Sequence, residues 1–256
     1  MNLFDVVIFG IVEGITEFLP VSSTGHLMLA GRLLGLVQND FLKSFEITIQ
    51  LGAIAAVVVL YGKVLLRDSE LLKRVIIAFL PTAVVGVIFY HTIHIFLGNV
   101  HIVVWSLFLG GLFLIIFERF YREEKEAVSD PSKMSYRSAF LIGLFQSAAL
   151  IPGVSRAAAT IIGGLILGLK RKAIVEFSFL LAIPTMLAAV GFDLIRHMSA
   201  FSSDQFKFLS IGFLTSFIVA MFAVKFLLHF IRNHNFIAFG IYRIVAAALF
   251  WFFCFR

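Results

Sequence analysis

Long apolar segments constrain this chain more than any other feature. Each is close to the roughly 20 residues that an α-helix needs to cross a bilayer. We expect full membrane spans at residues 45–62, 75–92, 102–118, 174–195, 208–231 and 236–255. The 256-residue chain is only 14% charged, against about 25% in soluble domains, so it cannot cover an aqueous surface. The sequence therefore predicts an all-α integral membrane protein that forms a single membrane domain, residues 1–256.

Two further apolar regions are interrupted by proline. Residues 3–37 break at Pro20 and residues 138–169 break at Pro152, and the pieces on either side are too short to span a bilayer. We interpret each region as a re-entrant helical hairpin that enters and leaves the membrane on one side. Non-helical backbone at that depth requires cover by protein or a water-filled cavity. For residues 3–37, the alternative is one tilted, kinked spanning helix.

The two broken regions belong to an internal repeat. Three pairs of segments align at nearly constant offset: Pro20–Ser23 with Pro152–Ser155, Leu34–Leu36 with Leu167–Leu169, and Glu46–Ile49 with Glu176–Phe179. We expect repeat one at residues 1–125 and repeat two at residues 138–256, each with one hairpin and three spans. Because each repeat crosses the membrane three times, an odd number, the second repeat begins on the opposite side and is inverted relative to the first. Inverted repeats with broken helices place a binding site where the two breaks meet.

Basic residues predict the orientation. Most Lys and Arg fall in four segments, residues 63–74, 119–137, 170–173 and 225–235, which we place in the cytoplasm because cytoplasmic loops are enriched in these residues. The net charge of +6 therefore needs no nucleic acid to explain it. The other side holds Arg32, Lys43, Arg196, Lys207 and Arg256. Both termini and the mouth of the first hairpin then face outward.

Two acids precede the first break. Glu13 and Glu17 are four residues apart, so their carboxylates share one helix face. Each costs about 2.5–3.5 kcal/mol at the membrane centre, and a partner must offset this. A divalent cation, Mg²⁺ or Ca²⁺, would do so, and so would Arg156 from the second break. The alternative is that the acids only hydrogen-bond neighbouring helices or lie shallow in the membrane.

A polar run follows Pro20. Ser22, Ser23, Thr24 and Gly25 could hold phosphoryl oxygens at a helix N-terminus, and one hydroxyl could be a nucleophile. His26, three residues after Ser23, could accept its proton or protonate a leaving group. The sequence does not choose between Ser23 and water as the attacking group. For any single hydroxyl, the alternative is a helix cap or turn former.

The second break adds a cation. Arg156 can bind phosphate oxygens through its planar fork, and Ser155 adds a donor. Arg243 in the last span is a weaker candidate, interpreted as an internal pair or a snorkelling cation. Glu46 and Glu176 are interpreted as helix-start acids favoured by the dipole.

These segments resemble a known family. Glu13–His26 looks like the first signature of the bacterial undecaprenyl pyrophosphate phosphatase, or bacitracin-resistance, family. Pro152–Arg156 with Thr160-Ile161 resembles its second signature, and Phe45–Ala53 and Glu176–Pro184 resemble further family segments. The resemblance covers essentially the whole chain. One departure is Ala157, where the second signature usually has a serine, so the hydroxyl that could contact phosphate from that position is missing.

The resemblance implies an activity and a site. The family removes the terminal phosphate from a C55 isoprenoid diphosphate, recycling the lipid carrier of cell-wall synthesis and conferring bacitracin resistance. It uses a divalent cation in the bacterial inner membrane, with its site open to the periplasmic or outer side. The carried-over catalytic residues are the metal-associated Glu13 and Glu17, the nucleophile or phosphate ligand Ser23, the acid/base His26 and the phosphate-binding Arg156. The expected substrate-binding residues are Ser22, Thr24, Gly25, Ser155 and Thr160.

The expected partners are the polyprenyl diphosphate and membrane lipids. No nucleic acid is expected, and a homo-oligomer is left open. The alternative function is a lipid-phosphate translocase or an ion-coupled transporter, because inverted repeats with broken helices also describe transporters. In that case Glu13 and Glu17 would bind the coupling ion.

Overall fold

The computed structural model describes residues 1–37, 39–97, 99–197 and 203–254. Every regular element in these ranges is a helix. The elements are α1 (Leu3–Thr16), α2 (Ser23–Leu33), α3 (Asp40–Arg67), α4 (Ser69–Ile88), α5 (Tyr90–Leu97), α6 (Val100–Phe120), η1 (Pro131–Lys133), α7 (Tyr136–Ser147), η2 (Ala148–Leu150), α8 (Arg156–Ile166), α9 (Arg171–His197), α10 (Ser203–Phe230) and α11 (Ile237–Cys254).

Short polar side chains define where several helices begin. The Asn2 side chain accepts the Asp5 backbone N–H at 3.1 Å, while the Asp5 carboxylate accepts the Asn2 N–H at 2.7 Å. The side chains of Asn39 and Asp68 likewise accept backbone N–H groups at the starts of α3 and α4, without the reciprocal bond. These bonds satisfy N–H groups that a helix start leaves free. Local sequence therefore sets these boundaries even though the chain is mostly apolar.

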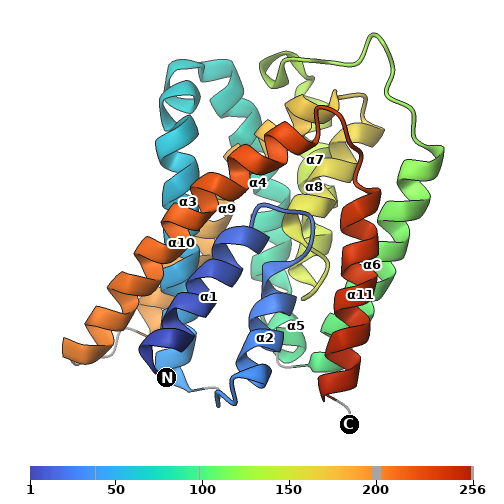
Figure 1. Ribbon diagram of the computed structural model, residues 1–256. Helices are drawn as coiled ribbons and strands as arrows, with labels where there is room; N and C mark the ends of the chain where they lie inside the picture. Colours follow the sequence, from blue (N-terminus) through green and yellow to red (C-terminus); the bar gives the residue numbers. More distant parts are fainter. Residues whose placement is uncertain (38, 98, 198–202, 255–256) are drawn as a thin grey trace.

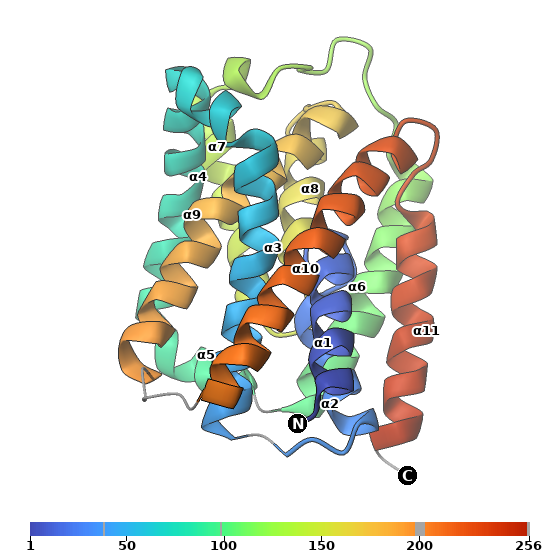
Figure 2. The same ribbon diagram turned by 60° about the vertical axis from the view of Figure 1, so that its left-hand side comes forward.

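The two broken regions enter the molecule from opposite ends. In Figure 1, α1 and α2 rise from the end that carries both termini, turn near mid-height and return, whereas α7 and α8 descend from the other end. The α3–α4, α6–α7, α8–α9 and α10–α11 connections all lie at that other end, and Figure 2 shows the same arrangement after rotation. Two breaks distant in sequence are thereby brought to the middle of the molecule.

Close helix packing holds each hairpin against a long helix of the other half of the chain. The first arm α1 lies along α10, and the corresponding arm α7 lies along α4. Glycine makes both contacts feasible. A Cβ on Gly143 would stand 2.0 Å from the Ala78 carbonyl oxygen, and one on Gly10 would stand 3.0 Å from the Gly212 carbonyl oxygen. Small residues of this kind let membrane helices approach at backbone distance.

Five helices, α3, α4, α6, α9 and α10, are long and apolar enough to cross a membrane. The expected last span corresponds to α11, which falls among the shorter apolar helices. Residues 63–74 and 91–101, at the ends of expected spans, were predicted to be loops, and both predictions are wrong. Residues 63–74 are helical except at Asp68, because its side chain caps α4 directly after α3 ends. Residues 91–101 contain most of α5. Phe255 and the side chains of His94, Arg196 and Arg256 lie outside the described residues.

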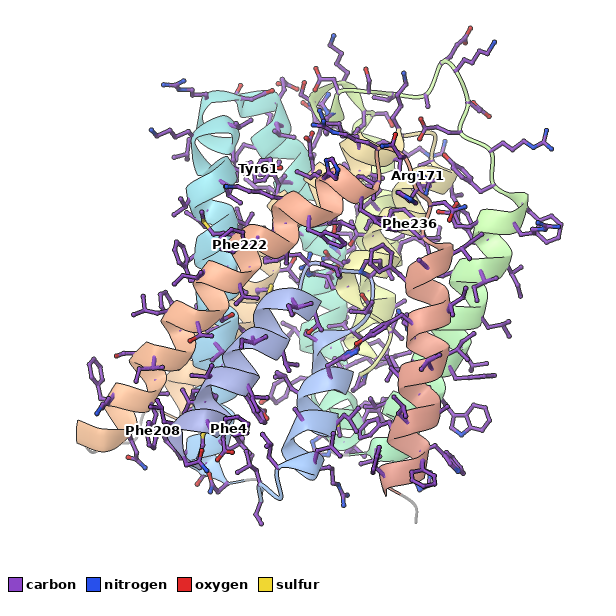
Figure 3. The ribbon with its side chains drawn as sticks, in the orientation of Figure 1. Phe4, Tyr61, Arg171, Phe208, Phe222 and Phe236 are labelled. Atoms are coloured by element: carbon purple, nitrogen blue, oxygen red, sulfur yellow. The ribbon has the colours of Figure 1, made fainter. Side chains whose placement is uncertain are left out.

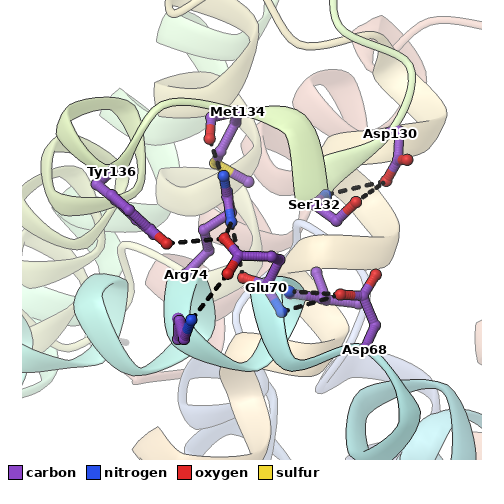
Figure 4. A network of polar contacts seen from close by, with 9 residues as sticks. Asp68, Glu70, Arg74, Asp130, Ser132, Met134 and Tyr136 are labelled. Carbon is purple, nitrogen blue, oxygen red and sulfur yellow. Dashed lines mark hydrogen bonds and ion pairs between the residues drawn. The ribbon is translucent and has the colours of Figure 1, made fainter.

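A polar network fixes the start of α4 to the segment before α7 (Figure 4). Glu70 accepts hydrogen bonds from Arg74 and Tyr136, both at 2.7 Å, and the Arg74 Nε donates to the Met134 carbonyl at 2.6 Å. Farther along, the Ser132 hydroxyl and backbone N–H hold the pKa of Asp130 below its usual range. The linker between the two halves is therefore ordered by specific contacts.

A second polar anchor joins α6, α9 and α11 at the same end. The Glu118 carboxylate pairs with both terminal nitrogens of Arg171 and accepts the Phe236 N–H at 3.1 Å. The Arg171 guanidinium also lies 5.0 Å from the centre of the Phe236 ring, and Figure 3 shows the two side chains together. Many large apolar side chains are exposed on the long helices, including Phe222 on α10, which is 68% exposed. Such a surface suits lipid, and the chain is a multi-pass membrane protein.

Candidate active site

Both breaks contain a serine in an unusual backbone conformation. Ser22 precedes α2 with φ 73° and Ser155 precedes α8 with φ 77°. Within the described ranges these are the two non-glycine residues with positive φ. Such a conformation costs about 1–3 kcal/mol and persists only where the surroundings enforce it. Its occurrence at both breaks marks them as places where geometry is held against local preference.

The strained serines lie at positions that the predicted alignment of the two breaks did not pair. That alignment paired Ser23 with Ser155, whereas Ser22 and Ser155 are the residues that directly precede α2 and α8. Ser23 and Arg156 are the first residues of these two helices. The Ser155 side chain accepts the Ala158 N–H, and the Ser22 side chain makes no such cap bond.

Glu17 is the point at which the two breaks meet. The Ser23 hydroxyl donates to Glu17 Oε2 at 2.5 Å, and Arg156 Nη2 donates to Glu17 Oε1 at 3.2 Å. The Arg156 and Glu17 side chains are only 11% and 8% exposed. Arg156 Nη1 also donates to the Ser178 carbonyl at 2.9 Å, and the guanidinium lies 5.7 Å from the centre of the Phe18 ring. Three of the predicted catalytic residues therefore form one connected, largely buried group.

This group opens into a cavity of about 220 Å³. Six of its lining residues were predicted site residues: Glu17, Ser22, Ser23, Thr24, Ser155 and Arg156. The first turns of α2 and α8 also face it, and the free N–H groups of a helix start attract anions. The cavity therefore combines a fixed cation, hydroxyls and two helix N-termini, which suits an anionic group such as phosphate.

The opposite wall of the cavity was not predicted from the sequence. The Gln146 amide donates to the Thr82 hydroxyl at 3.0 Å and to the Thr185 hydroxyl at 3.1 Å, and all three residues line the cavity. Gln50 lines it as well. A signal existed, because polar residues within membrane spans are rare and usually face an interior or a cavity. Thr82 and Thr185 moreover each follow a proline within their helix.

Glu13 lies behind the cavity. Its side chain is fully buried, and neither carboxylate oxygen has a hydrogen-bond partner in the described part of the chain. Glu17, Glu46 and Arg156 are close enough to act on it electrostatically. A buried carboxylate without a partner is costly. It is therefore the group in this site that most needs a cation.

His26 contacts Ser22 and Tyr242 in this structure. Its Nδ1 lies 2.7 Å from the Ser22 carbonyl oxygen and its Nε2 lies 2.8 Å from the Tyr242 hydroxyl, with the two rings stacked 5.4 Å apart. Both ring nitrogens are thus engaged. The acid/base role of His26 stays a prediction, and its observed contacts support the strained Ser22.

The other predicted residues contribute indirectly. Thr160 is buried and donates to Gln146 Oε1 at 3.3 Å, so it supports the cavity wall that contains Gln146. Gly25 faces α6, where a Cβ would stand 3.0 Å from a Leu107 methyl carbon. Ala157 is fully buried and does not line the cavity. A residue at position 157 is therefore buried beside the cavity without lining it.

The interpretation of two acids as helix-start residues is wrong. Glu46 and Glu176 both lie beyond the first turn, since α3 begins at Asp40 and α9 begins at Arg171. The predicted spans were shorter than these helices, which placed both acids artificially near a terminus. Glu176 instead pairs with Lys172, at 3.8 Å.

Known proteins resemble this chain over nearly its whole length. The family model described as bacitracin resistance protein BacA matches residues 6–249. A protein of Aquifex aeolicus named undecaprenyl-diphosphatase is 52% identical over 96% of both chains. A protein of Sulfurihydrogenibium sp. with the same name is 50% identical over 98% of this chain and 99% of the relative. Another, of Persephonella marina, is 49% identical over 98% of both chains.

Proposed function

The chain belongs to the bacitracin resistance protein BacA family, and from this premise we propose that it removes the terminal phosphate of undecaprenyl diphosphate in the cavity between the two breaks. The observation that carries the assignment of the site is the joint contact of Glu17 with Ser23 and Arg156. It brings a hydroxyl, a carboxylate and a guanidinium together beside two helix N-termini. The product is undecaprenyl phosphate, the carrier lipid of cell-wall synthesis, and bacitracin resistance is the property that the family's name records.

Arg156 and the helix N-termini hold the diphosphate. Phosphoryl transfer relies on positioning and on stabilising the charge of the transferring group. Hydrogen bonds to the Ser178 carbonyl and to Glu17 hold the Arg156 guanidinium in place, so its orientation is set before substrate binds. The free N–H groups at the starts of α2 and α8 add donors that need no rearrangement. These groups would bind the terminal phosphate more tightly as its negative charge shifts during transfer.

Ser23 is the nucleophile in this proposal. Its oxygen forms a bond to the terminal phosphorus while the bond from that phosphorus to the bridging oxygen breaks, and undecaprenyl phosphate leaves. Glu17 takes the hydroxyl proton, because it already accepts the Ser23 hydrogen bond at 2.5 Å. A nucleophile activated by an adjacent base is the usual arrangement for a serine. Water then attacks the phosphoserine and releases inorganic phosphate.

The residues present fit a divalent cation. Glu13 supplies two buried carboxylate oxygens that lack partners, and Glu17 lies beside it. Among the described residues, no group of three or more His, Cys, Asp or Glu is clustered closely enough to hold a metal. Mg²⁺ is commonly held by one or two carboxylates together with substrate phosphates. When bound by Glu13 and Glu17, Mg²⁺ or Ca²⁺ would neutralise phosphate charge.

The finer architecture is also a proposal: two inverted repeats, each a hairpin with three spans, giving six spans. Three observations support it. The N-caps Ser22 and Ser155 share positive φ, and Gly35 and Gly168, at the same offset of 133, have φ 66° and φ 81° after α2 and α8. The packing of α1 on α10 is matched by that of α7 on α4.

We further propose that the protein lies in the bacterial inner membrane with its cavity open to the outer side. The connections rich in Lys and Arg share one end of the molecule in Figure 1, opposite the termini. Labelling with a membrane-impermeant thiol reagent in intact cells tests this, in a Cys254→Ser background. Lys43→Cys should react and Lys125→Cys should not. The reverse pattern would overturn the orientation.

Phosphate release tests the function. Purified protein in detergent should release phosphate from undecaprenyl diphosphate with Mg²⁺ or Ca²⁺ and lose this activity in a chelator. Arg156→Ala and Ser23→Ala should both reduce turnover by at least a hundredfold, and acid-quenched parent enzyme should carry phosphate on Ser23. Substantial turnover by Ser23→Ala would refute the covalent step and leave water as the attacking group. Folded parent protein without any phosphate release would instead favour a translocase.

A further inference from the structure

Arg243 on α11 is fully buried, and its guanidinium binds only backbone carbonyls in the described part of the chain. Its N–H groups donate to five oxygens at 2.9–3.4 Å, and these belong to Pro20, Ser106, Leu107, Gly153 and Val154. A guanidinium has five N–H donors in a rigid fork. The number of acceptors therefore matches the number of donors.

The five carbonyls come from three separate parts of the structure. Pro20 belongs to the first break, Gly153 and Val154 belong to the second, and Ser106 and Leu107 belong to α6. Carbonyls in broken helices have no partner within their own helix, and water does not reach them readily at membrane depth. One side chain from α11 therefore satisfies oxygens of both breaks and fixes their separation.

The charge of Arg243 has no acidic counterpart among the described residues, where the ion pairs involve other cations. A buried charge offset only by carbonyl dipoles is costly, so a neutral side chain would be favoured if packing were its only role. Arg243 does not line the cavity, whereas its partner Gly153 does. Its influence on substrate is therefore exerted through the backbone that it holds.

Gly110 on α6 makes room for this arrangement. A Cβ at that position would lie 2.1 Å from Arg243 Nη2 and 2.8 Å from Cζ. The guanidinium cannot move aside without losing hydrogen bonds to the breaks. Alanine at position 110 would consequently disturb the Arg243 contacts from a second helix, without changing Arg243 or any cavity-lining residue.

We infer that Arg243 is a positioning residue, which holds the two breaks in the register that lets Glu17, Ser23 and Arg156 meet. The inference rests on the proposed function for its catalytic consequence. Displacement of reacting groups by about 1 Å can reduce rate a hundredfold. Loss of the five bonds should thus reduce kcat strongly, because Ser23 loses its alignment with the terminal phosphorus. Binding of the charged diphosphate should change less, because electrostatic attraction falls only slowly with distance.

The test compares Arg243→Met, Arg243→Lys and Gly110→Ala with Glu118→Gln, whose ion pair lies away from the cavity. Kinetics are normalised to folded protein. Arg243→Met should lower kcat about a hundredfold with less than a fivefold change in KM. Lysine should restore part of kcat because it keeps some donors, and Gly110→Ala should lower kcat in the same direction. Glu118→Gln should leave kcat within twofold of the parent.

A readout independent of activity is amide hydrogen exchange in peptides that cover residues 17–24 and 150–157. Both should exchange faster together in Arg243→Met and Gly110→Ala, and neither should in Glu118→Gln. Unchanged exchange, a change at only one break, or a parental kcat in folded Arg243→Met would overturn the inference. An inactive parent would refute the proposed function instead, while the exchange data would still decide whether Arg243 holds the breaks.

Discussion

Replacing Glu17 by glutamine removes the charge and the basicity of the carboxylate and keeps nearly the same side-chain shape. The amide keeps one acceptor oxygen but presents an NH₂ donor to either Ser23 or Arg156, both of which donate to Glu17 in the parent. Loss of a positioned general base typically reduces rate by 10²–10⁴, which corresponds to about 2.7–5.4 kcal/mol of activation free energy. We expect kcat to fall within this range. Arg156 also loses its counter-charge at a site where it is 11% exposed, so the free energy of unfolding should fall by up to about 3–5 kcal/mol.

The assay is phosphate release at saturating substrate, normalised to the folded fraction measured by thermal unfolding in detergent. Glu118→Gln is the matched control, because it also removes the carboxylate of a buried Glu–Arg pair, the one with Arg171. That variant should lose stability and keep its kcat. A kcat for Glu17→Gln within threefold of the parent would refute the role of Glu17 as base. Equal loss of kcat in both variants would show that the assay reports folding rather than chemistry.

Three further predictions address packing, the histidine and the cation. Gly143→Ala places a methyl group 2.0 Å from the Ala78 carbonyl oxygen and should cost about 1–3 kcal/mol of stability; an unchanged melting temperature would contradict the close approach of α7 to α4. Tyr242→Phe removes the partner of His26 Nε2, and kcat/KM should fall severalfold, whereas full activity would show that this contact is dispensable. In the parent protein, Mg²⁺ or Ca²⁺ at one hundred times its Kd should add about 2.7 kcal/mol to the free energy of unfolding and raise the melting temperature. In Glu13→Gln the cations should no longer raise the melting temperature. Retained stabilisation in this variant would place the cation elsewhere.

The site residues that could be predicted from the sequence are those that lie in or next to a recognisable local sequence pattern. Pro20 and Pro152 interrupt apolar segments, and serines follow each of them. Membrane physics then requires buried breaks, and buried breaks must lie against one another or a cavity. That reasoning was sufficient to unite Glu17 with Arg156, residues 139 positions apart.

The remainder depends on contacts for which the sequence carries no local pattern. Gln146, Thr82 and Thr185 come from three helices, and their hydrogen bonds arise only when α4, α7 and α9 pack together. The pairing of His26 with Tyr242 joins residues 216 positions apart. Helix lengths were underestimated for a different reason. Charged residues in the first and last turns were interpreted as loops, although they lie within helices that begin at side-chain caps.

The position of Arg243 has a consequence for how the molecule is assembled. Its helix, α11, follows every other element of the site along the chain, and proteins are synthesised from the N-terminus. While the earlier helices enter the membrane, the carbonyls of both breaks lack the side chain that later binds them. The cavity can therefore reach its final shape only after α11 has been inserted. A ribosome-bound chain that stops before residue 237 should already contain Glu17, Ser23 and Arg156 and yet be inactive.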